Sequence, residues 1–259
     1  MNEFDAITDE AKAIGAVNTI IPTEKDGKVE LVGDNTDWIA IHALSQRHMT
    51  PSAKDEGLAA LVIGAGGSAR AAIYAMHKLG ASKIWLFNRT PANAVLLAKQ
   101  LPKEWNVQVT ESMKDMNPLP RVVVSNVPAD GTSAEVGAQA GLIFPKEIFA
   151  HPEGGVVIDM SCEYGRGESV ADSIADAFSL CTTDKPYHTP LLGLAEKVNA
   201  SRIENSGNAA AGRWAVIPGV VILLEQGCEQ FERWTGVAAP RAEIEQAAWS
   251  KYLGPPASS

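Results

Sequence analysis

The chain has 259 residues, of which 46% are hydrophobic and 20% charged, and its formal net charge at pH 7 is −9. No cluster of Lys and Arg provides the basic surface that direct nucleic-acid binding needs, and the most apolar stretch, 215–224, is too short to span a bilayer. The three cysteines and five histidines have no metal-ligand spacing, and acidic residues crowd the first ten positions where a signal peptide would be apolar. We therefore expect a cytoplasmic protein without a metal site and without membrane or direct nucleic-acid contacts.

The first fifty residues contain the elements of a small α/β unit. The segments 16–21 (AVNTII) and 28–33 (KVELVG) are rich in residues that favour strands and flank a short turn. The segment 37–48 has its apolar residues on one face of a predicted helix. A polar linker with proline and glycine follows at 49–57.

Beyond the linker, the sequence alternates between buried strands and helices. The unbroken apolar run at 58–63 is typical of a strand buried on both faces. The alternation predicts an α/β fold, in which a doubly wound parallel, Rossmann-like domain spans 57–205. We expect the mostly helical segment 206–259 to return to a partial α/β substrate domain formed by 1–50. The other predicted strands are 83–87, 121–125 and 155–160, and the predicted helices of this half are the stretch after the first strand, to about residue 79, and 91–101.

A glycine-rich turn follows the first buried strand and opens a helix, with the pattern G-x-G-x-x-A. In such a turn the first glycine permits a tight bend, the second lets the backbone approach a pyrophosphate, and the small third residue lets the helix pack on the strand. The N–H groups at the helix N-terminus then face the anion. An ordinary tight turn is the alternative, and the strand–turn–helix context favours a dinucleotide. The predicted cofactor loop consists of Gly64, Ala65, Gly66, Gly67, Ser68 and Ala69.

The next strand ends where an enzyme specific for NAD places an acidic residue on the ribose. Here the residues are Asn88, Arg89 and Thr90, so a guanidinium takes the place of a carboxylate. A guanidinium binds a 2′-phosphate bidentately, whereas an acidic side chain would repel it. The alternative is a solvated arginine beside a helix cap at Thr90, which Pro91 supports. The pattern favours NADP as the cofactor.

Two short polar motifs precede the linker. AVNT places Asn18 at the start of a strand, and GDNTD ends a strand and opens a helix with Asp37. Taken alone, the second motif is a turn with a helix cap, which is the commoner role of such residues.

The order of the motifs resembles that of the shikimate dehydrogenase family. AVNT, GDNTD, GAGGSARAA and NRT are followed late in the chain by Gly219 and Gln226, and the resemblance runs from about 8 to 236. The segments ITDEAKAIGAVNTI, GDNTDW and LLEQGCEQFERWTG are most similar to the C-terminal domain of the fungal pentafunctional arom polypeptide. The resemblance implies NADP-dependent, reversible reduction of 3-dehydroshikimate to shikimate.

The same resemblance implies roles for individual residues. Asn18, Asp37 and Gln226 are expected to bind the hydroxyl groups of the substrate, with Asp37 as one member of the catalytic pair. The backbone of Gly219 is expected beside the nicotinamide. The remaining cofactor-binding residues are the loop 64–69 together with Asn88, Arg89 and Thr90.

The sequence departs from the family at two places. In the family the catalytic lysine lies in a Pro-x-Lys segment ahead of AVNT, and we expect the chain to begin just past that point. Lys12 is expected on a solvated helix face and is no substitute. A stretch of 23 residues, 161–183, separates the predicted strand that ends near 159 from DKPYHTPLL, and Asp184 stands where the family has a tyrosine.

These departures leave two functions open. One is a shikimate dehydrogenase whose activity is negligible without the lysine. The other is a catalytically inactive, metabolite-sensing domain like that of quinate-pathway repressors, which would bind shikimate or quinate. We also expect an exposed apolar edge on the first domain, at Ile14, Val17 and Ile20, and hence a homodimer or a place in a larger multidomain polypeptide.

Overall fold

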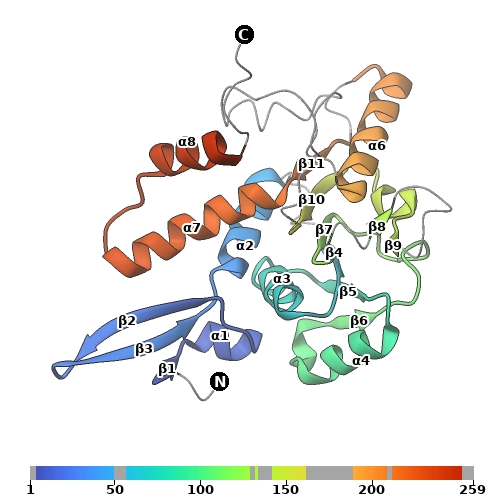
Figure 1. Cartoon of the computed structure of the whole chain (residues 1–259). Coiled ribbons are helices and arrows are strands. Elements are labelled where there is room, and N and C mark those ends of the chain that lie inside the picture. Colours follow the sequence, from blue (N-terminus) through green and yellow to red (C-terminus); the bar gives the residue numbers. More distant parts are fainter. Residues whose placement is uncertain are drawn as a thin grey trace, which may run out of the picture.

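The computed structural model describes residues 4–49, 57–128, 132–133, 142–161, 189–208 and 212–252. Its central feature is a six-stranded sheet with helices on both faces, and a three-stranded sheet lies to one side (Figure 1). The strands are β1 (Ala6–Ile7), β2 (Thr19–Lys25), β3 (Lys28–Asp34), β4 (Ala59–Ile63), β5 (Lys83–Phe87), β6 (Val107–Val109), β7 (Val122–Ser125), β8 (Thr132–Ser133), β9 (Leu142–Ile143), β10 (Gly155–Asp159) and β11 (Trp214–Ile217). The helices are α1 (Asp9–Ile14), α2 (Asp37–His48), α3 (Gly67–Lys78), α4 (Pro91–Gln100), η2 (Lys103–Trp105), η4 (Lys146–Phe149), α6 (Pro190–Ser206), α7 (Gly219–Thr235) and α8 (Arg241–Tyr252).

The large sheet has the order β11-β10-β7-β4-β5-β6, and all its pairs are parallel. The chain leaves β4 in one direction through β5 and β6 and returns to the other side through β7, β10 and β11. This order confirms the predicted doubly wound, Rossmann-like fold. In such a sheet the crevice between the two central strands, here β4 and β7, opens at their carboxyl ends.

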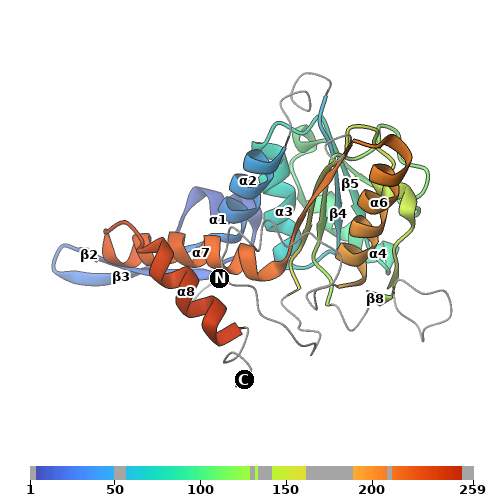
Figure 2. The ribbon, with the colours of Figure 1, turned by 90° about the horizontal axis from the view of Figure 1, so that it is seen from above.

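Successive residues of the central strands are buried on opposite faces of this sheet. Ala60 and Val62 of β4 belong to a core formed with α2, α3, α4 and the start of α7. Leu61 and Ile63 belong to a second core, formed with η4 and α6. Figure 2 shows the sheet between α2 and α3 on one side and α6 on the other. Two-sided burial explains why these strands are continuous apolar runs in the sequence.

The small sheet has the order β1-β3-β2, with β1 parallel and β2 antiparallel to β3. The 17-residue helix α7 starts beside the carboxyl end of β10 and extends to this sheet (Figure 1). It is therefore the element that spans the two sheets. No helix of the described residues is long and apolar enough to cross a membrane.

Three details of the sequence-based prediction need correction. The strand expected from residue 16 begins at Thr19, because the preceding residues form the irregular segment that holds Asn18. The strand β11 lies in the part expected to be mostly helical. It was missed because only one proline separates its apolar residues from the apolar start of α7. The three-residue strand β6 was not expected. Most of the stretch 161–183 and Asp184 lie outside the described residues.

The predicted apolar edge is correct in part. Ile20 is 47% exposed on β2, as expected. Ile14 is completely buried, because it ends α1 and packs in the core that contains α3. Val17 is half-buried and lies against Gly33 of β3.

The close approach of β10 to its neighbours leads to a prediction about stability. A Cβ at Gly155 would overlap the carbonyl oxygen of Arg121, which directly precedes β7, and lie 3.0 Å from the ring of Trp214 in β11. We expect Gly155→Ala to lower the free energy of unfolding by about 3 kcal/mol or more. Gly227→Ala is the matched control, because a Cβ there meets no atom within 4 Å and α7 gains helix propensity. Denaturant titration of both variants checks this, and equal stabilities would contradict it.

Candidate active site

The turn after β4 has the geometry of a dinucleotide-binding loop. Gly64 has a φ of +113°, which favours glycine, and its N–H donates to the carbonyl oxygen of Phe87 at 2.8 Å. A Cβ at Gly64 would lie 3.1 Å from the carbonyl oxygen of Asn126, just after β7. The turn therefore sits over the two central strands, at the point where doubly wound sheets bind ligands.

The N-terminus of α3 is suited to an anion. Its N-cap, Gly66, has no side chain with which to cap the helix, and a Cβ added to it would have no atom within 4 Å. Ser68 is exposed, whereas Ala69 is fully buried and brings the helix close to the sheet. The first N–H groups of a helix lack intrahelical partners and carry a partial positive charge. Open space above such a terminus fits a pyrophosphate.

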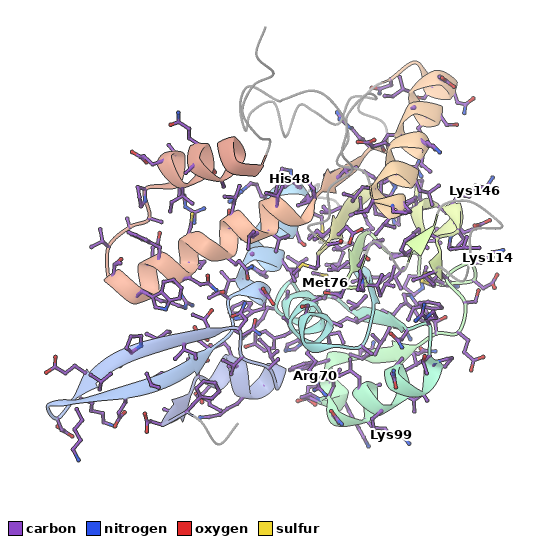
Figure 3. All side chains as sticks on the ribbon, in the orientation of Figure 1. His48, Arg70, Met76, Lys99, Lys114 and Lys146 are labelled. Atoms are coloured by element: carbon purple, nitrogen blue, oxygen red, sulfur yellow. The ribbon has the colours of Figure 1, made fainter. Side chains whose placement is uncertain are left out.

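Arg70, the cation in the first turn of α3, already has a contact within the protein. Its guanidinium donates to Gln100 at the end of α4 and lies 3.2 Å from the Cβ position of Gly15, the C-cap of α1. Figure 3 shows the label of Arg70 between α1 and α4. This side chain therefore ties α3 to its neighbours.

The loop after β5 presents an exposed arginine. Asn88 Nδ2 donates to the carbonyl oxygen of Thr90 at 2.9 Å, which closes the turn. Thr90 is the N-cap of α4 but its side chain makes no cap hydrogen bond, and Pro91 occupies the first turn. Arg89 is exposed and forms no salt bridge within the described part of the chain. No carboxylate competes for it at the end of β5.

The structure brings the three predicted substrate-binding residues into one hydrogen-bonded group. Asn18 Nδ2 donates to Gln226 Oε1 at 3.1 Å, although the two residues are 208 positions apart. Asn18 Oδ1 accepts from the backbone N–H of Thr36 at 2.8 Å. Asp37 follows at once as the first residue of α2.

Asp37 is half-buried, and its environment changes its acidity. Burial raises the pKa of the Asp37 carboxyl above its ordinary value, and a hydrogen bond from Asn18 opposes part of this rise. The N-cap position belongs to Thr36, whose side chain makes no cap hydrogen bond. A carboxyl group with a raised pKa can hold a proton closer to neutral pH than an exposed one.

The group formed by Asn18, Asp37 and Gln226 lies near the glycine-rich loop 64–69. A Cβ at Gly67 would lie 3.7 Å from the Cβ of Ala16, two residues before Asn18. Lys12 is not part of this group, because its side chain is 60% exposed and forms an ion pair with Asp9 at 3.2 Å. The expectation that Lys12 lies on a solvated face is confirmed.

Gly219 begins α7 and touches the carboxyl end of β10. A Cβ there would overlap the carbonyl oxygen of Ser161 and lie 3.0 Å from that of Asp159. Any side chain at this position would therefore push α7 away from the sheet. The backbone of Gly219 thus lies at the carboxyl edge of the sheet, at the same edge as the cofactor loop.

Several polar residues of this region were not singled out in the sequence. Asp159 is 3% exposed and accepts from Thr189 Oγ1 at 2.6 Å and from the Ser161 N–H at 3.1 Å. On α7, Gln230 donates to Thr19 Oγ1 at 3.0 Å and Arg233 donates to Asp34 at 2.7 Å. The spacing of Gln226, Gln230 and Arg233 by four and three residues, one face of a helix, was the available signal.

The fold and the loop geometry define an α/β protein of the Rossmann-like class. Two family models match the chain: "Shikimate / quinate 5-dehydrogenase" at residues 46–133 and "Shikimate 5'-dehydrogenase C-terminal domain" at residues 219–248. The chain belongs to the shikimate dehydrogenase family. A relative, the pentafunctional AROM polypeptide of Mycosarcoma maydis, is 48% identical over 263 residues; the match covers 96% of this chain and 14% of the relative.

Solved structures agree with this assignment. The dehydroquinate dehydratase and shikimate dehydrogenase of S. pombe AroM is 31% identical, with a TM-score of 0.65, and the match covers 96% of this chain and 40% of that one. The shikimate dehydrogenase of Aquifex aeolicus is 28% identical, with a TM-score of 0.60, over 96% of this chain and 71% of that one. The chain thus spans about one seventh of the length of its AROM relative. The resemblance to the AROM form, inferred from the sequence motifs, is confirmed.

Asp159 makes the stability of this region depend on pH. Burial raises the pKa of Asp159 to about 6, against 3.8 for the ordinary group, although hydrogen bonds from Thr189 and Ser161 lower it. Because the folded protein binds this proton more tightly than the unfolded chain, the contribution to stability is full below pH 4 and is lost as the pH rises to about 6.

We therefore compare wild type with Asp159→Asn, which cannot titrate and can still bond to Ser161 and Thr189. Relative to the variant, the wild-type free energy of unfolding should fall by about 2–3 kcal/mol between pH 4.5 and 7.5. Denaturant titrations across this range measure the difference. A difference that does not change with pH would show that the carboxyl titrates normally.

Proposed function

We propose that this chain is an NADP-dependent shikimate dehydrogenase-type protein that interconverts 3-dehydroshikimate and shikimate. Membership of the family supports an oxidoreductase of this class. The observation that carries the proposal is the group of Asn18, Asp37 and Gln226, which joins two distant segments beside a loop suited to a dinucleotide. A polyhydroxylated ring requires several fixed polar groups of this kind.

The reaction converts 3-dehydroshikimate, NADPH and one proton into shikimate and NADP⁺. The cofactor, when bound, supplies the hydride. The amides of Asn18 and Gln226 would orient the ring through its hydroxyl groups, and Asp37 would exchange a proton with the hydroxyl that forms or is lost. The raised pKa of Asp37 supports this last role, because a group that transfers protons works best when its pKa approaches the operating pH.

The cofactor would lie along the carboxyl edge of the large sheet. Its pyrophosphate would bind at 64–69, and its 2′-phosphate would bind to Arg89 within the turn 88–90. The nicotinamide would lie beside the backbone of Gly219, where α7 starts at the carboxyl edge of the sheet. In this arrangement 57–205 form the cofactor domain, while 1–50 and α7 frame the substrate.

A second candidate is a protein that binds the metabolite, shikimate or quinate, without turning it over. Two observations favour it: the partner of the Asp37 carboxyl is the amide of Asn18, and Lys12 is exposed and paired with Asp9. A proton transfer without a second acid–base group loses about 10²–10⁴ in rate. A coupled assay of shikimate with NADP⁺ separates the candidates, since binding without turnover supports the second.

The first prediction for the cofactor concerns Arg89. We expect NADPH to bind more tightly than NADH, because the exposed guanidinium can pair with the 2′-phosphate and no acid opposes it. Arg89→Ala should weaken NADPH binding by roughly 1.5–3 kcal/mol and leave NADH binding little changed. Calorimetric titration of both nucleotides with both proteins measures this.

Gly66→Ala is a control that tests whether both nucleotides bind at the glycine-rich loop. Its new Cβ meets no protein atom, so the fold should persist while both nucleotides lose affinity. Equal affinity of the wild type for NADPH and NADH would show that Arg89 does not recognise the phosphate.

The second prediction concerns the ligand group. Asp37→Asn and Gln226→Ala should each weaken shikimate binding by a few kcal/mol and leave the affinity for NADPH unchanged, since both side chains would face one ligand. Titrations with shikimate and quinate in the presence of NADPH measure this. If both variants instead lower the melting temperature and leave ligand binding unaltered, Asp37 serves only the helix terminus, a contribution of about 0.5–2 kcal/mol.

A further inference from the structure

The orientation of the Asn18 amide is determined by a donor that cannot act as an acceptor. The backbone N–H of Thr36 donates to Asn18 Oδ1 at 2.8 Å. The oxygen side of the amide must therefore face the start of α2, and its nitrogen side faces Gln226 at 3.1 Å. A flipped amide would place an NH₂ group against the N–H of Thr36.

A second hydrogen bond to the same oxygen has a defined direction. Thr19 Oγ1 lies 2.7 Å from Asn18 Oδ1, and Thr19 is 1% exposed. A hydroxyl has one hydrogen, and if it donates to Asn18 it can only accept from its other neighbours. Two neighbours remain: Gln230, whose Nε2 donates to Thr19 Oγ1 at 3.0 Å, and Thr36, whose Oγ1 lies 3.2 Å away and can donate as well. The direction of the chain is thus from Gln230 through Thr19 to Asn18.

The backbone of Asn18 is anchored by the same helix. Its N–H donates to the carbonyl oxygen of Asp34 at 3.0 Å. The Asp34 carboxylate, 4% exposed, accepts from Arg233 Nε and from Thr8 Oγ1, each at 2.7 Å. Burial alone would raise the pKa of Asp34, but the hydrogen bonds from Arg233 and Thr8 outweigh it and hold the pKa below its ordinary value. The carboxylate is therefore charged and fully engaged at neutral pH.

We propose that Gln230 and Arg233 are positioning residues for the substrate site, because through Thr19 and Asp34 they hold the Asn18 amide with its donor side toward Gln226 and Asp37. This inference rests on the proposed function. It adds a specific division of labour on α7: Gln226 faces the ligand, while the residues one and two turns further on set the geometry of its partner. Arg233 fixes the position of the Asn18 backbone, and Gln230 fixes the direction of its side-chain hydrogen bonds.

Two substitutions of similar size at Gln230 separate positioning from packing. Gln230→Glu puts an acceptor where the donor stood, so the hydrogen of Thr19 should turn to the new carboxylate and leave Asn18. Gln230→Met removes the donor but leaves Thr19 free to donate to Asn18. Positioning predicts that the Glu variant is the more damaging for the site, whereas a packing role predicts similar effects.

The first readout needs no ligand. In Gln230→Glu, the amide hydrogen of Thr36 should exchange at least tenfold faster, because its acceptor is disturbed, while Val123 in the centre of β7 should exchange at the wild-type rate. Gln230→Met, which removes the donor without adding an acceptor, should speed the exchange of Thr36 by about threefold and leave Val123 at the wild-type rate. Site-resolved exchange by NMR measures these rates.

The second readout is shikimate affinity in the presence of NADPH. Gln230→Glu should bind shikimate roughly tenfold more weakly than Gln230→Met at high ionic strength, where repulsion between the new charge and the ligand is screened. Arg233→Leu should lose a similar factor. Arg241→Leu, which removes the same charge from the contact between α8 and α7 at Glu225, should keep wild-type affinity.

The outcomes distinguish the two proposals. Equal Thr36 exchange in the Glu and Met variants would overturn the positioning role whatever the ligand data show. If wild-type protein binds no shikimate, the proposed function fails, and the exchange rates alone decide whether Gln230 orients Asn18. If exchange changes as expected but affinity does not, Asn18 is oriented by Gln230 without serving the ligand, and the inference fails as a statement about the substrate site.

Discussion

The candidate site depends on the contact between the start of α7 and the carboxyl end of β10. Gly219 can approach the carbonyl oxygens of Asp159 and Ser161 only because it lacks a side chain. From this fixed origin the helix reaches the small sheet, where Gln226, Gln230 and Arg233 make hydrogen bonds to residues about 200 positions earlier in the chain. The position of the substrate group relative to the cofactor loop is therefore set by backbone packing, and the polar contacts refine it.

Three aspartates of the protein show how the surroundings of a carboxyl group decide its chemistry. Asp34 is fully compensated by a guanidinium and a hydroxyl, so its pKa is lowered. Asp37 and Asp159 are buried with hydrogen-bond donors that are neutral, and the pKa of each is raised. Desolvation dominates where no cation is near, and a paired cation reverses the sign. The compensated group is suited to holding structure, and the uncompensated groups are suited to changing their protonation.

The sequence predicted the large sheet well because two-sided burial requires continuous apolar strands, as at 58–63 and 121–125. The prediction failed where an apolar run does not show whether it forms a strand or a helix. The strand β11 and the start of α7 are both apolar and are separated only by Pro218. At the candidate site, Asn18, Asp37 and Gln226 were predicted from their motifs. Gln230 and Arg233 were not, because their partners are 211 and 199 residues away and no local pattern encodes such a pairing.

The length of α7 has a mechanical consequence. Its 17 residues make a rod of about 25 Å, anchored at one end by a glycine and bonded near the other end through Trp234 Nε1 to the carbonyl oxygen of Ile20 at 2.8 Å. A tilt of about 5° around Gly219 displaces the far end by roughly 2 Å, enough to break a hydrogen bond of this length. The helix therefore tolerates little tilt: its hydrogen bonds with the small sheet persist only while its start stays packed against β10.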